Sequence, residues 1–399
     1  MGNKTVLVSG GSIAGPTLAF WLNKHGFKTT IVERVTTLRL GGQNIDISGA
    51  ARAVVRKMGI ETEIITASTG ELGVRFVDEN DVSKAVLEAS TDDKERFMRL
   101  EILRGDLSKI LYEHTKNEVE YLFGNQITAL EEQPENVKVT FQNGTIRHFD
   151  FVIAADGIRS STRNLMFGNE AVIKFLKLYI AYFTIPKADS DTNWARWYNA
   201  KNSRAIFIRP DNVGTTRVSF SFMSAPKGYE KLTLSEQKAI LKAKFEDVAW
   251  EAPRILKALD SVAEIHTDAI SQVNAPRWSN GRFAMVGDAA FCPSPLSGMG
   301  ASLSVVGAYV LAGEMSKHTD PKQAFDAYEK LMRPYVKTIQ QLPPGVPRLA
   351  HPKGKFGLFL MHTVLNIISS RFVKKLSTIF SSSDQSELSD SIELPDYGK

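Results

Sequence analysis

Apolar positions at the start of the chain follow a strand, helix, strand pattern. Residues 4–9 form an apolar run typical of a buried strand, and residues 28–33 repeat it. Between them, residues 15–25 carry apolar side chains at helical spacing. Residues 4–33 therefore predict a βαβ unit.

The pattern continues to alternate between helix and strand as far as about residue 172. Residues 50–58 and 101–116 predict helices, and residues 70–80 predict a strand that enters a turn. Residues 137–157 predict a hairpin with Asn143-Gly144 at its turn, followed by an apolar strand.

From about residue 173 the sequence pattern changes to short β-rich runs joined by turn residues, with one predicted helix over 234–245. The strand, turn and helix pattern then returns near residue 276. This order predicts an α/β protein whose first domain is interrupted by an insertion. The predicted units are a discontinuous α/β domain over 1–172 and 276–341, an inserted β-sheet domain over 173–275, a C-terminal helical segment over 342–380 and an acidic tail over 381–399.

The composition is that of an ordinary globular protein, with 43% hydrophobic and 23% charged residues in a chain of 399. The net charge of +5 comes from Lys and Arg scattered among acids, without the basic stripe that nucleic acid requires. Cys292 is the only cysteine, which excludes an intramolecular disulfide and a Cys-based metal site. The N-terminus leads directly into the first strand, without an export signal. We therefore expect a cytoplasmic monomer that binds a small molecule and no resident metal.

The first chemical motif is Gly10-Gly11-Ser12-Ile13-Ala14-Gly15, which joins the first strand to the first helix. A dinucleotide site needs a tight turn at its first glycine, close backbone approach at its second and helix packing at its third. Gly10 and Gly15 fit the first and third roles, whereas Ser12 stands at the second. Glu33 ends the next strand, where it could bind the adenosine ribose hydroxyls. The motif predicts nucleotide binding at the helix N-terminus, with a purely structural turn as the alternative.

Two further motifs are ambiguous when taken alone. Arg104 belongs to the predicted 101–116 helix, where a single Arg is usually a solvated surface group. Asp156-Gly157 ends an apolar strand, and ligands of open α/β folds bind beyond such ends. An Asp-Gly pair is also an ordinary turn.

The fourth motif spans residues 286–302. A strand ends in Gly287-Asp288, and a loop containing Pro295, Gly298 and Gly300 leads into an apolar helix. The free N–H groups of that helix N-terminus point back at whatever the loop holds.

Together, the four motifs resemble those of the group A flavoprotein monooxygenases, which have the para-hydroxybenzoate hydroxylase fold and include tetracycline-inactivating members. The motifs follow the family's order from residue 8 to residue 315, over three quarters of the chain. The resemblance implies an α/β fold in which a discontinuous Rossmann-like FAD-binding domain carries an inserted β-sheet substrate domain and a C-terminal helix. It implies FAD and NAD(P)H as cofactors.

The resemblance also implies a role for each motif. The first turn and Glu33 would bind the ADP half of FAD, Arg104 would lie along its ribityl and pyrophosphate side, and Asp288 would bond the ribityl hydroxyls. Asp156 would lie near the pyrophosphate and NAD(P)H. Residues 293–300, which contain Pro295, Gly298 and Gly300 and which we call the flavin loop, would line the isoalloxazine ring. The predicted cofactor-binding residues are Gly10, Ser12, Ile13, Ala14, Gly15, Glu33, Arg34, Gln43, Asp46, Arg104, Asp156, Gly157, Gly287, Asp288, Pro295, Gly298, Gly300 and Ala301.

Some positions depart from the family's pattern. Phe291 stands where members commonly have His, and Ala301 and Ser302 stand where an Asn is common. The segment 42–47, which contains Gln43 and Asp46, passes the ring end of the cofactor in the family, although a glycine-rich surface turn explains it equally well.

The chemistry implied by the resemblance is hydroxylation of a phenolic, enolic or polyketide-like molecule, with tetracycline-type antibiotics included. NAD(P)H would reduce the flavin, O₂ would add to give a C4a-hydroperoxide, and its distal oxygen would go to an electron-rich carbon. Because this chemistry needs a dry site, we expect the substrate between the flavin loop and the inserted sheet. No catalytic residue is predicted, since Arg209, Arg217 and His266 are each more often structural or surface residues. The alternative is a non-catalytic flavoprotein or a protein that sequesters its small molecule.

Two other features have simpler interpretations. Cys292 fits a small buried hydrophobe better than a redox group or a covalent flavin link. Residues 356–380 predict a basic amphipathic helix. Packing across the two domains is favoured over contact with a membrane surface.

Overall fold

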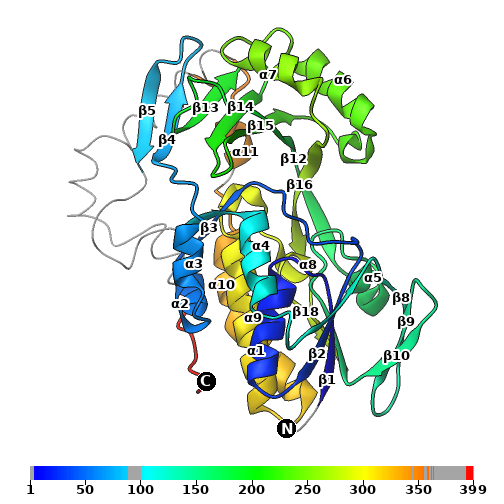
Figure 1. Cartoon of the computed structure of the whole chain (residues 1–399). Helices are drawn as coiled ribbons and strands as arrows, with labels where there is room; N and C mark the ends of the chain where they lie inside the picture. Colours follow the sequence, from blue (N-terminus) through cyan, green and yellow to red (C-terminus); the bar gives the residue numbers. More distant parts are fainter. Residues whose placement is uncertain are drawn as a thin grey trace.

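The computed structural model describes residues 4–88, 100–343, 345–354, 357, 358, 361, 363 and 392–398. Figure 1 shows two sheets, one above the other, with a layer of long helices packed beside the lower one. The predicted α/β fold class is confirmed. The predicted 356–380 helix and the 381–399 tail lie mostly outside the described residues.

The lower sheet has six strands in the order β17-β18-β11-β1-β2-β7, and all neighbours except β17 and β18 are parallel. Its central strands are buried on both faces, as their continuous apolar runs predict. The predicted βαβ unit is present, with α1 at Ala14–Lys24 between β1 and β2. The strand bounds are β1 Thr5–Ser9, β2 Lys28–Glu33, β7 Glu120–Phe123, β11 Phe151–Ala154, β17 Ser279–Asn280 and β18 Phe283–Met285.

The helix α9 is the centre of the lower unit. It spans Gly300–Lys317 and is buried from Ser302 to Met315, which explains why its sequence is apolar all round. It packs against α1 and α10, and Trp21 meets Tyr309 edge to face at 4.8 Å. The other helices of this unit are α2 Ala50–Lys57, α3 Glu61–Thr66, α4 Arg104–Glu113, α5 Ser161–Phe167, α8 Asp288–Phe291 and α10 Pro321–Gln340.

The predicted helix over 101–116 is wrong at its start. Leu100–Leu103 form strand β6, and α4 begins at Arg104. β6 pairs antiparallel with β3, Asn44–Ile47, and the helical pattern cannot reveal such a partner distant in sequence. A small third sheet contains the predicted hairpin, with Gly144 at φ +82° in its turn. Its strands are β8 Ile127–Glu132, β9 Val137–Phe141 and β10 Ile146–Phe149.

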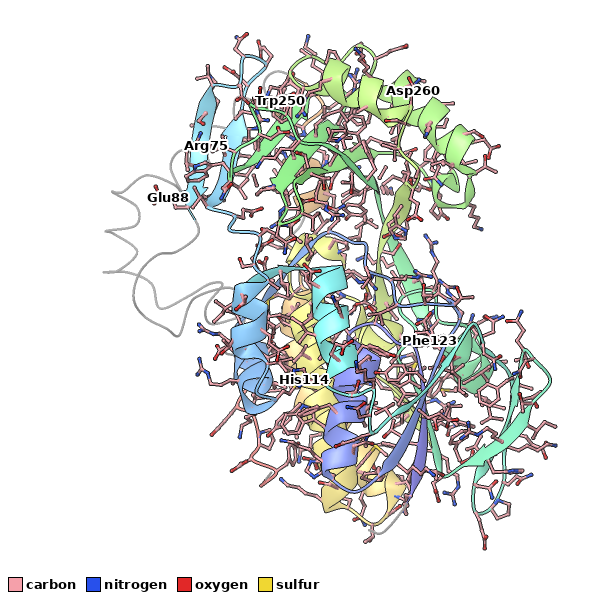
Figure 2. All side chains as sticks on the ribbon, in the orientation of Figure 1. Arg75, Glu88, His114, Phe123, Trp250 and Asp260 are labelled. Carbon is pink, nitrogen blue, oxygen red and sulfur yellow. The ribbon has the colours of Figure 1, made fainter. Side chains whose placement is uncertain are left out.

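The upper sheet has seven strands in the order β16-β12-β15-β14-β13-β4-β5. Five of them come from the predicted insertion, but β4 and β5 come from residues 73–88, which the sequence analysis assigned to the first domain. These two strands form one edge of the upper sheet. Figure 2 shows Arg75 of β4 and Glu88 of β5 at this edge, away from Asp260, which follows α7. The bounds are β4 Gly73–Val77, β5 Ser83–Glu88, β12 Val172–Pro186, β13 Ala195–Ala200, β14 Arg204–Pro210, β15 Thr215–Met223, β16 His266–Asn274, α6 Leu234–Phe245 and α7 Ala252–Leu259.

The strands β12 and β16 connect the two units. They pair antiparallel along most of their length and run from the upper sheet down to the helical layer (Figure 1). At the lower end of β16, the Val273 N–H donates to the Cys292 carbonyl at 3.0 Å. This bond joins β16 to the residues after α8. The Gln272 side-chain amide also donates to the Pro293 carbonyl at 3.2 Å, so β16 is attached to the beginning of the flavin loop.

The segment 351–353, which follows α11 (Val346–Ala350), docks on the upper sheet. His351 is buried; its Nδ1 lies 3.0 Å from the Pro347 carbonyl and its Nε2 lies 2.8 Å from the Ser221 hydroxyl. Because a carbonyl only accepts, Nδ1 carries the proton and Nε2 accepts from Ser221. Burial lowers the pKa of His351 to about 4, against the weaker opposing effect of Pro347.

Because His351 is buried in its neutral form, we expect the free energy of unfolding to depend on pH. Between about pH 6.5 and about pH 4, His351 is protonated in the unfolded chain but stays neutral in the folded chain. The free energy of unfolding therefore decreases as the pH falls through this window. We expect the wild type to lose about 2 kcal/mol more than His351→Gln between pH 7 and pH 5. Urea unfolding at both pH values measures this difference. An equal loss in both proteins would contradict it.

The described C-terminal residues, 392–398, pack against α9. The Tyr397 hydroxyl donates to Glu314 Oε1 at 2.7 Å, and the Tyr309 hydroxyl donates to the Pro395 carbonyl at 2.8 Å. A Cβ on Gly313 would lie 2.3 Å from the Tyr397 ring, so glycine is needed there for the ring to seat. Burial and the Glu314 carboxylate raise the pKa of Tyr397.

We expect Tyr397→Phe to lower the free energy of unfolding by about 1–3 kcal/mol, because it leaves a buried Glu314 oxygen without this donor. Urea unfolding at neutral pH checks the value. The control is Tyr112→Phe, since no described residue bonds the Tyr112 hydroxyl, and it is expected to change stability by less than about 0.5 kcal/mol. Equal effects of the two substitutions would show that the Tyr397 hydroxyl contributes nothing.

Candidate functional site

A large cavity lies between the carboxyl ends of the lower sheet and the underside of the upper sheet. Its volume is about 2390 Å³, well above the roughly 300–1,000 Å³ of a typical ligand pocket, so it has room for a large cofactor and a second molecule. Most predicted cofactor-binding residues line it. They are Ser12, Ile13, Ala14, Arg34, Gln43, Asp46, Arg104, Asp156, Gly157, Asp288, Pro295, Gly298, Gly300 and Ala301.

The remaining predicted residues lie just behind the cavity wall and shape the turns. A Cβ on Gly15 would lie 1.9 Å from the Gly10 carbonyl oxygen, and a Cβ on Gly10 would lie 2.5 Å from the Ala155 carbonyl oxygen. Glu33 accepts from the Gly11 N–H at 2.8 Å and from the Val35 N–H at 3.2 Å. A Cβ on Gly287 would lie 2.9 Å from that of Ala14. These close approaches leave the N-terminus of α1 open to the cavity.

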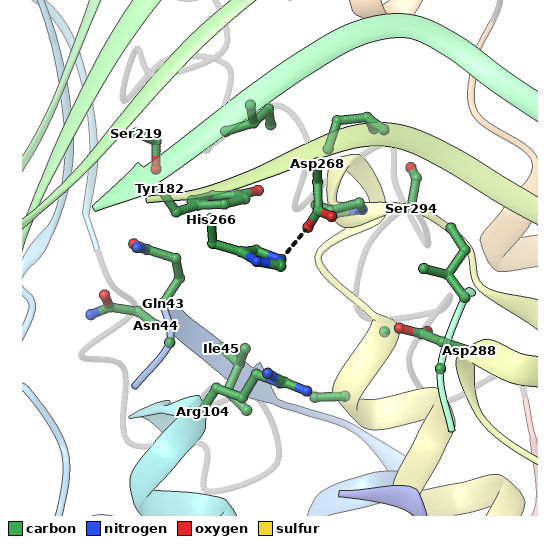
Figure 3. A pocket seen from close by; sticks show the side chains of 18 of the residues that line it. Gln43, Asn44, Ile45, Arg104, Tyr182, Ser219, His266, Asp268, Asp288 and Ser294 are labelled. Atoms are coloured by element: carbon green, nitrogen blue, oxygen red, sulfur yellow. Dashed lines mark hydrogen bonds and ion pairs between the residues drawn. The ribbon is translucent and has the colours of Figure 1, made fainter. Parts of the chain in front are cut away.

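Ser12, at the position where a second glycine is expected, connects two motifs. Its hydroxyl accepts from Arg104 Nη2 at 2.9 Å and lies 3.3 Å from the Ser108 hydroxyl on α4. Figure 3 shows the Arg104 side chain extended across the floor of the cavity. Burial lowers the pKa of Arg104, whereas the nearby Asp288 carboxylate raises it. Ser12 thus orients a half-buried cation beside the first turn.

The Asp156 carboxylate lines the cavity but is also used within its own loop. It accepts from the Ser160 hydroxyl and, at 3.2 Å, from the Thr162 N–H at the start of α5. Gly157 follows with φ +85°, a conformation that favours glycine. The Asp-Gly pair is therefore both the strand-end turn and the anchor of α5.

Arg163 is a residue of this region that the sequence analysis missed. Its guanidinium is buried and donates to the Ala289 carbonyl at 2.9 Å and to the Ile158 carbonyl at 3.0 Å. It therefore joins the loop after β11 to α8, the helix that begins at Asp288. The only signal in the sequence is an Arg close after Asp156-Gly157, and nothing local distinguishes it from a surface Arg.

Asp288 and the flavin loop form another part of the cavity wall. Burial raises the pKa of Asp288, against the effect of Arg104. Ser294 has φ +77°, and its side-chain oxygen is buried with no hydrogen-bond partner among the described residues. Gly300 and Ala301 begin α9, so the N-terminus of this long helix opens onto the cavity.

The departures from the family's pattern have structural explanations. Phe291 packs against Trp278 at 4.8 Å, in the core rather than at the cavity. The Ser302 hydroxyl donates to the Asp46 carbonyl at 3.3 Å and accepts from the Ser48 N–H at 3.2 Å. Ser302 thereby attaches the 42–48 segment to α9.

Cys292 is buried, and its thiol lies 3.8 Å from the Ser271 carbonyl. Burial and the neighbouring Asp288 raise the pKa of the Cys292 thiol well above its usual value. A thiol in this environment is a poor nucleophile.

The upper wall carries the polar side chains of the inserted sheet. Arg209 forms two bonds to Glu71, at 2.7 and 3.0 Å, and Arg217 bonds Asp211 at 3.1 Å. These two arginines are neutralised by carboxylates. The ring of His266 also lies in the cavity, beside the Asp268 carboxylate (Figure 3).

The residues around the cavity fit FAD. Two helix N-termini and the Arg104 guanidinium suit a pyrophosphate and an electron-rich ring. The glycine positions keep Cβ atoms out of the turns, and the orphaned Ser294 hydroxyl is available to a bound molecule. The fold and the site thus define a flavin-binding protein.

The comparisons with known proteins agree with this class. Residues 3–342 match the family model described as FAD binding domain, and the chain belongs to this family. A flavin-dependent monooxygenase of Legionella longbeachae is 35% identical over 407 residues, covering 99% of this chain and 98% of the relative. The flavin-dependent monooxygenase eupH of Phoma sp is 34% identical over 427 residues, covering 98% of this chain and 97% of the relative.

Solved structures give the same result. The tetracycline destructase Tet(55) superposes with a TM-score of 0.83 and 31% identity, over 99% of both chains. Klebsiella pneumoniae HpxO, solved with FAD and uric acid, shares the fold with a TM-score of 0.78 and 18% identity, over 93% of this chain and 95% of that one. The predicted family, enzyme class and FAD cofactor are confirmed: the chain has the fold and family of the flavin-dependent monooxygenases.

The described part of the chain lacks two kinds of feature. It contains no helix both long and apolar enough to cross a membrane. It also contains no group of three or more His, Cys, Asp or Glu side chains placed to hold a metal ion.

Proposed function

We propose that this protein uses NAD(P)H and O₂ to hydroxylate a phenolic, enolic or polyketide-like molecule, with tetracycline-type antibiotics among the candidates. The observation that carries the proposal is the shared cavity, in which the flavin loop faces the inserted sheet. The similarity to a tetracycline destructase over nearly the whole chain supports the substrate class.

Bound FAD would supply electron transfer from NAD(P)H and activation of O₂. The first turn would hold its pyrophosphate on the N-terminus of α1, and Glu33 would exchange its bond to Gly11 for the ribose hydroxyls. Arg104 and Asp288 would lie along the ribityl chain. The N-terminus of α9 would stabilise negative charge on the reduced ring.

We assign residues 1–172 and 276–341 to the FAD-binding domain and 173–275 to the substrate domain, with the β4–β5 hairpin as an N-terminal contribution to the latter. The upper sheet would close the cavity and exclude water from the reacting atoms. We further propose that the protein acts as a monomer in the cytoplasm, where a chain with one cysteine needs no disulfide.

The test is to load the purified protein with FAD, record its visible spectrum, and screen phenols and tetracyclines for stimulated NADPH and NADH oxidation. A product that has gained one oxygen atom supports the proposal. Binding of a candidate without stimulated oxidation of either nucleotide would favour the alternative, a protein that sequesters its ligand.

A further inference from the structure

A histidine and an aspartate stand together on the wall that faces the substrate space. His266 and Asp268 are two residues apart on β16 and so share one face of the strand. His266 Nε2 lies 3.0 Å from Asp268 Oδ2, and both residues line the cavity (Figure 3). The His266 side chain is 66% exposed, so a molecule in the cavity can reach it.

The neighbouring residues hold this pair in a defined orientation. Tyr182 is the cross-strand partner of His266, and the two rings stack at 6.5 Å with an interplanar angle of 22°. Arg159 Nη2 donates to the other Asp268 oxygen at 3.4 Å. Burial opposes ionisation of Asp268, but the hydrogen bond from His266 and the nearby Arg159 leave its pKa below the usual value.

The hydrogen bonds also determine which ring nitrogen is available. An ionised carboxylate only accepts, so Nε2 of His266 carries the proton that bonds Asp268. Nδ1 is then the unprotonated nitrogen, and no hydrogen bond joins it to any residue in the described part of the chain. A histidine with one nitrogen on a carboxylate and the other free has the arrangement of a general base.

This base lies on the strand that is attached to the flavin loop. β16 packs against α8, and the same cavity contains His266, Asp268, Asp288 and Pro295. A substrate between the flavin loop and the upper sheet would therefore meet His266 while one of its carbons faces the cofactor.

We propose that His266 accepts the proton of the acidic hydroxyl of a phenol or enol substrate, with Asp268 and Arg159 as positioning residues. The O–H bond breaks, its electron pair stays on the substrate oxygen, and the proton moves to Nδ1 of His266. Asp268 stabilises the imidazolium that forms. The resulting oxyanion enriches the ring carbons in electrons, which favours attack on an electrophilic oxygen. This inference rests on the proposed function for its substrate class.

The test compares FAD-loaded wild type, His266→Gln and Asp268→Asn, with His148→Gln as control because His148 is exposed on β10, outside the cavity wall. The probes are 4-nitrophenol and tetracycline, whose absorbance distinguishes neutral from ionised forms. Difference spectra without NADPH, taken below the pKa of each free probe, report the form that is bound. FAD content is measured for every variant.

We expect wild type and His148→Gln to bind at least one probe as its anion, and His266→Gln to bind it in the neutral form. In turnover, kcat of His266→Gln should fall at least ~100-fold at neutral pH and recover at high pH, where the substrate ionises in solution. Asp268→Asn should move the pH profile of kcat with little change in KM. The charged groups that also face this site and shape the profile are Asp268, Arg159, Arg104, Arg209 and Asp288.

An anion bound equally well by wild type and His266→Gln would overturn the inference, and so would the absence of binding of either probe to the wild type. Ionisation that depends on His266 but leads to no oxygen incorporation would leave the base in place and overturn only the proposed hydroxylation.

Discussion

Gly15→Ala is expected to raise the Kd for FAD at least ~100-fold, equivalent to about 3 kcal/mol of binding free energy. The new Cβ would lie 1.9 Å from the Gly10 carbonyl oxygen and 3.1 Å from its carbon. Both are backbone atoms, so a side chain cannot simply rotate away. Either the turn opens or α1 shifts, and in both cases the N-terminus of α1 leaves the position where it would bind the pyrophosphate.

Titration of the apo protein with FAD, followed by quenching of flavin fluorescence, measures the effect. The control is Gly354→Ala, because a Cβ on Gly354 meets no atom within 4 Å and this residue does not line the cavity. Circular dichroism of both variants separates loss of binding from loss of fold. A folded Gly15→Ala protein with wild-type affinity would show that this turn does not hold the cofactor.

Arg163→Met is expected to lower the free energy of unfolding by about 2–5 kcal/mol. Arg163 is buried, and its loss leaves the buried Ala289 carbonyl and the partly buried Ile158 carbonyl without these donors, at about 1–3 kcal/mol for each group, the lower end applying to Ile158. The same substitution should weaken FAD binding, because Ala289 follows Asp288 and Ile158 follows Gly157 in the walls of the cavity.

The control for this prediction is Arg277→Met. Arg277 also forms two bonds to a partner, Glu170, but both side chains are about 40% exposed, and such pairs contribute no more than about 1 kcal/mol. Urea unfolding of the apo proteins and FAD titration give the two readouts. Equal destabilisation by the two substitutions would show that Arg163 does not join the two loops in the way its hydrogen bonds indicate.

Much of the lower unit was predictable because its signals are local. The apolar runs of β1 and β11 and the glycine pattern between β1 and α1 depend on neighbours within a few residues. The Asn143-Gly144 turn needs only the conformational freedom of glycine. For these elements, short-range backbone preferences and burial agree.

Other parts of the fold depend on partners distant in sequence. Leu100–Leu103 has a pattern compatible with a helix, and pairing with Asn44–Ile47 makes it a strand. In the same way, β13 of the insertion pairs with β4, more than a hundred residues earlier. No periodicity within β4 indicates the sheet that it joins.

The features of the site also separate into those set by local sequence and those set by tertiary contacts. The sequence by itself determined where the backbone must turn tightly and which helices begin beside those turns, because a missing Cβ and an unpaired N–H are properties of the local chain. Only the tertiary structure decided that Ser12 holds Arg104, that Arg163 joins two loops, and that His266 faces the cavity with Asp268 and Tyr182 behind it. The orientation of a side chain, and the charges it meets, depend on strands and helices that are brought together only when the whole chain packs.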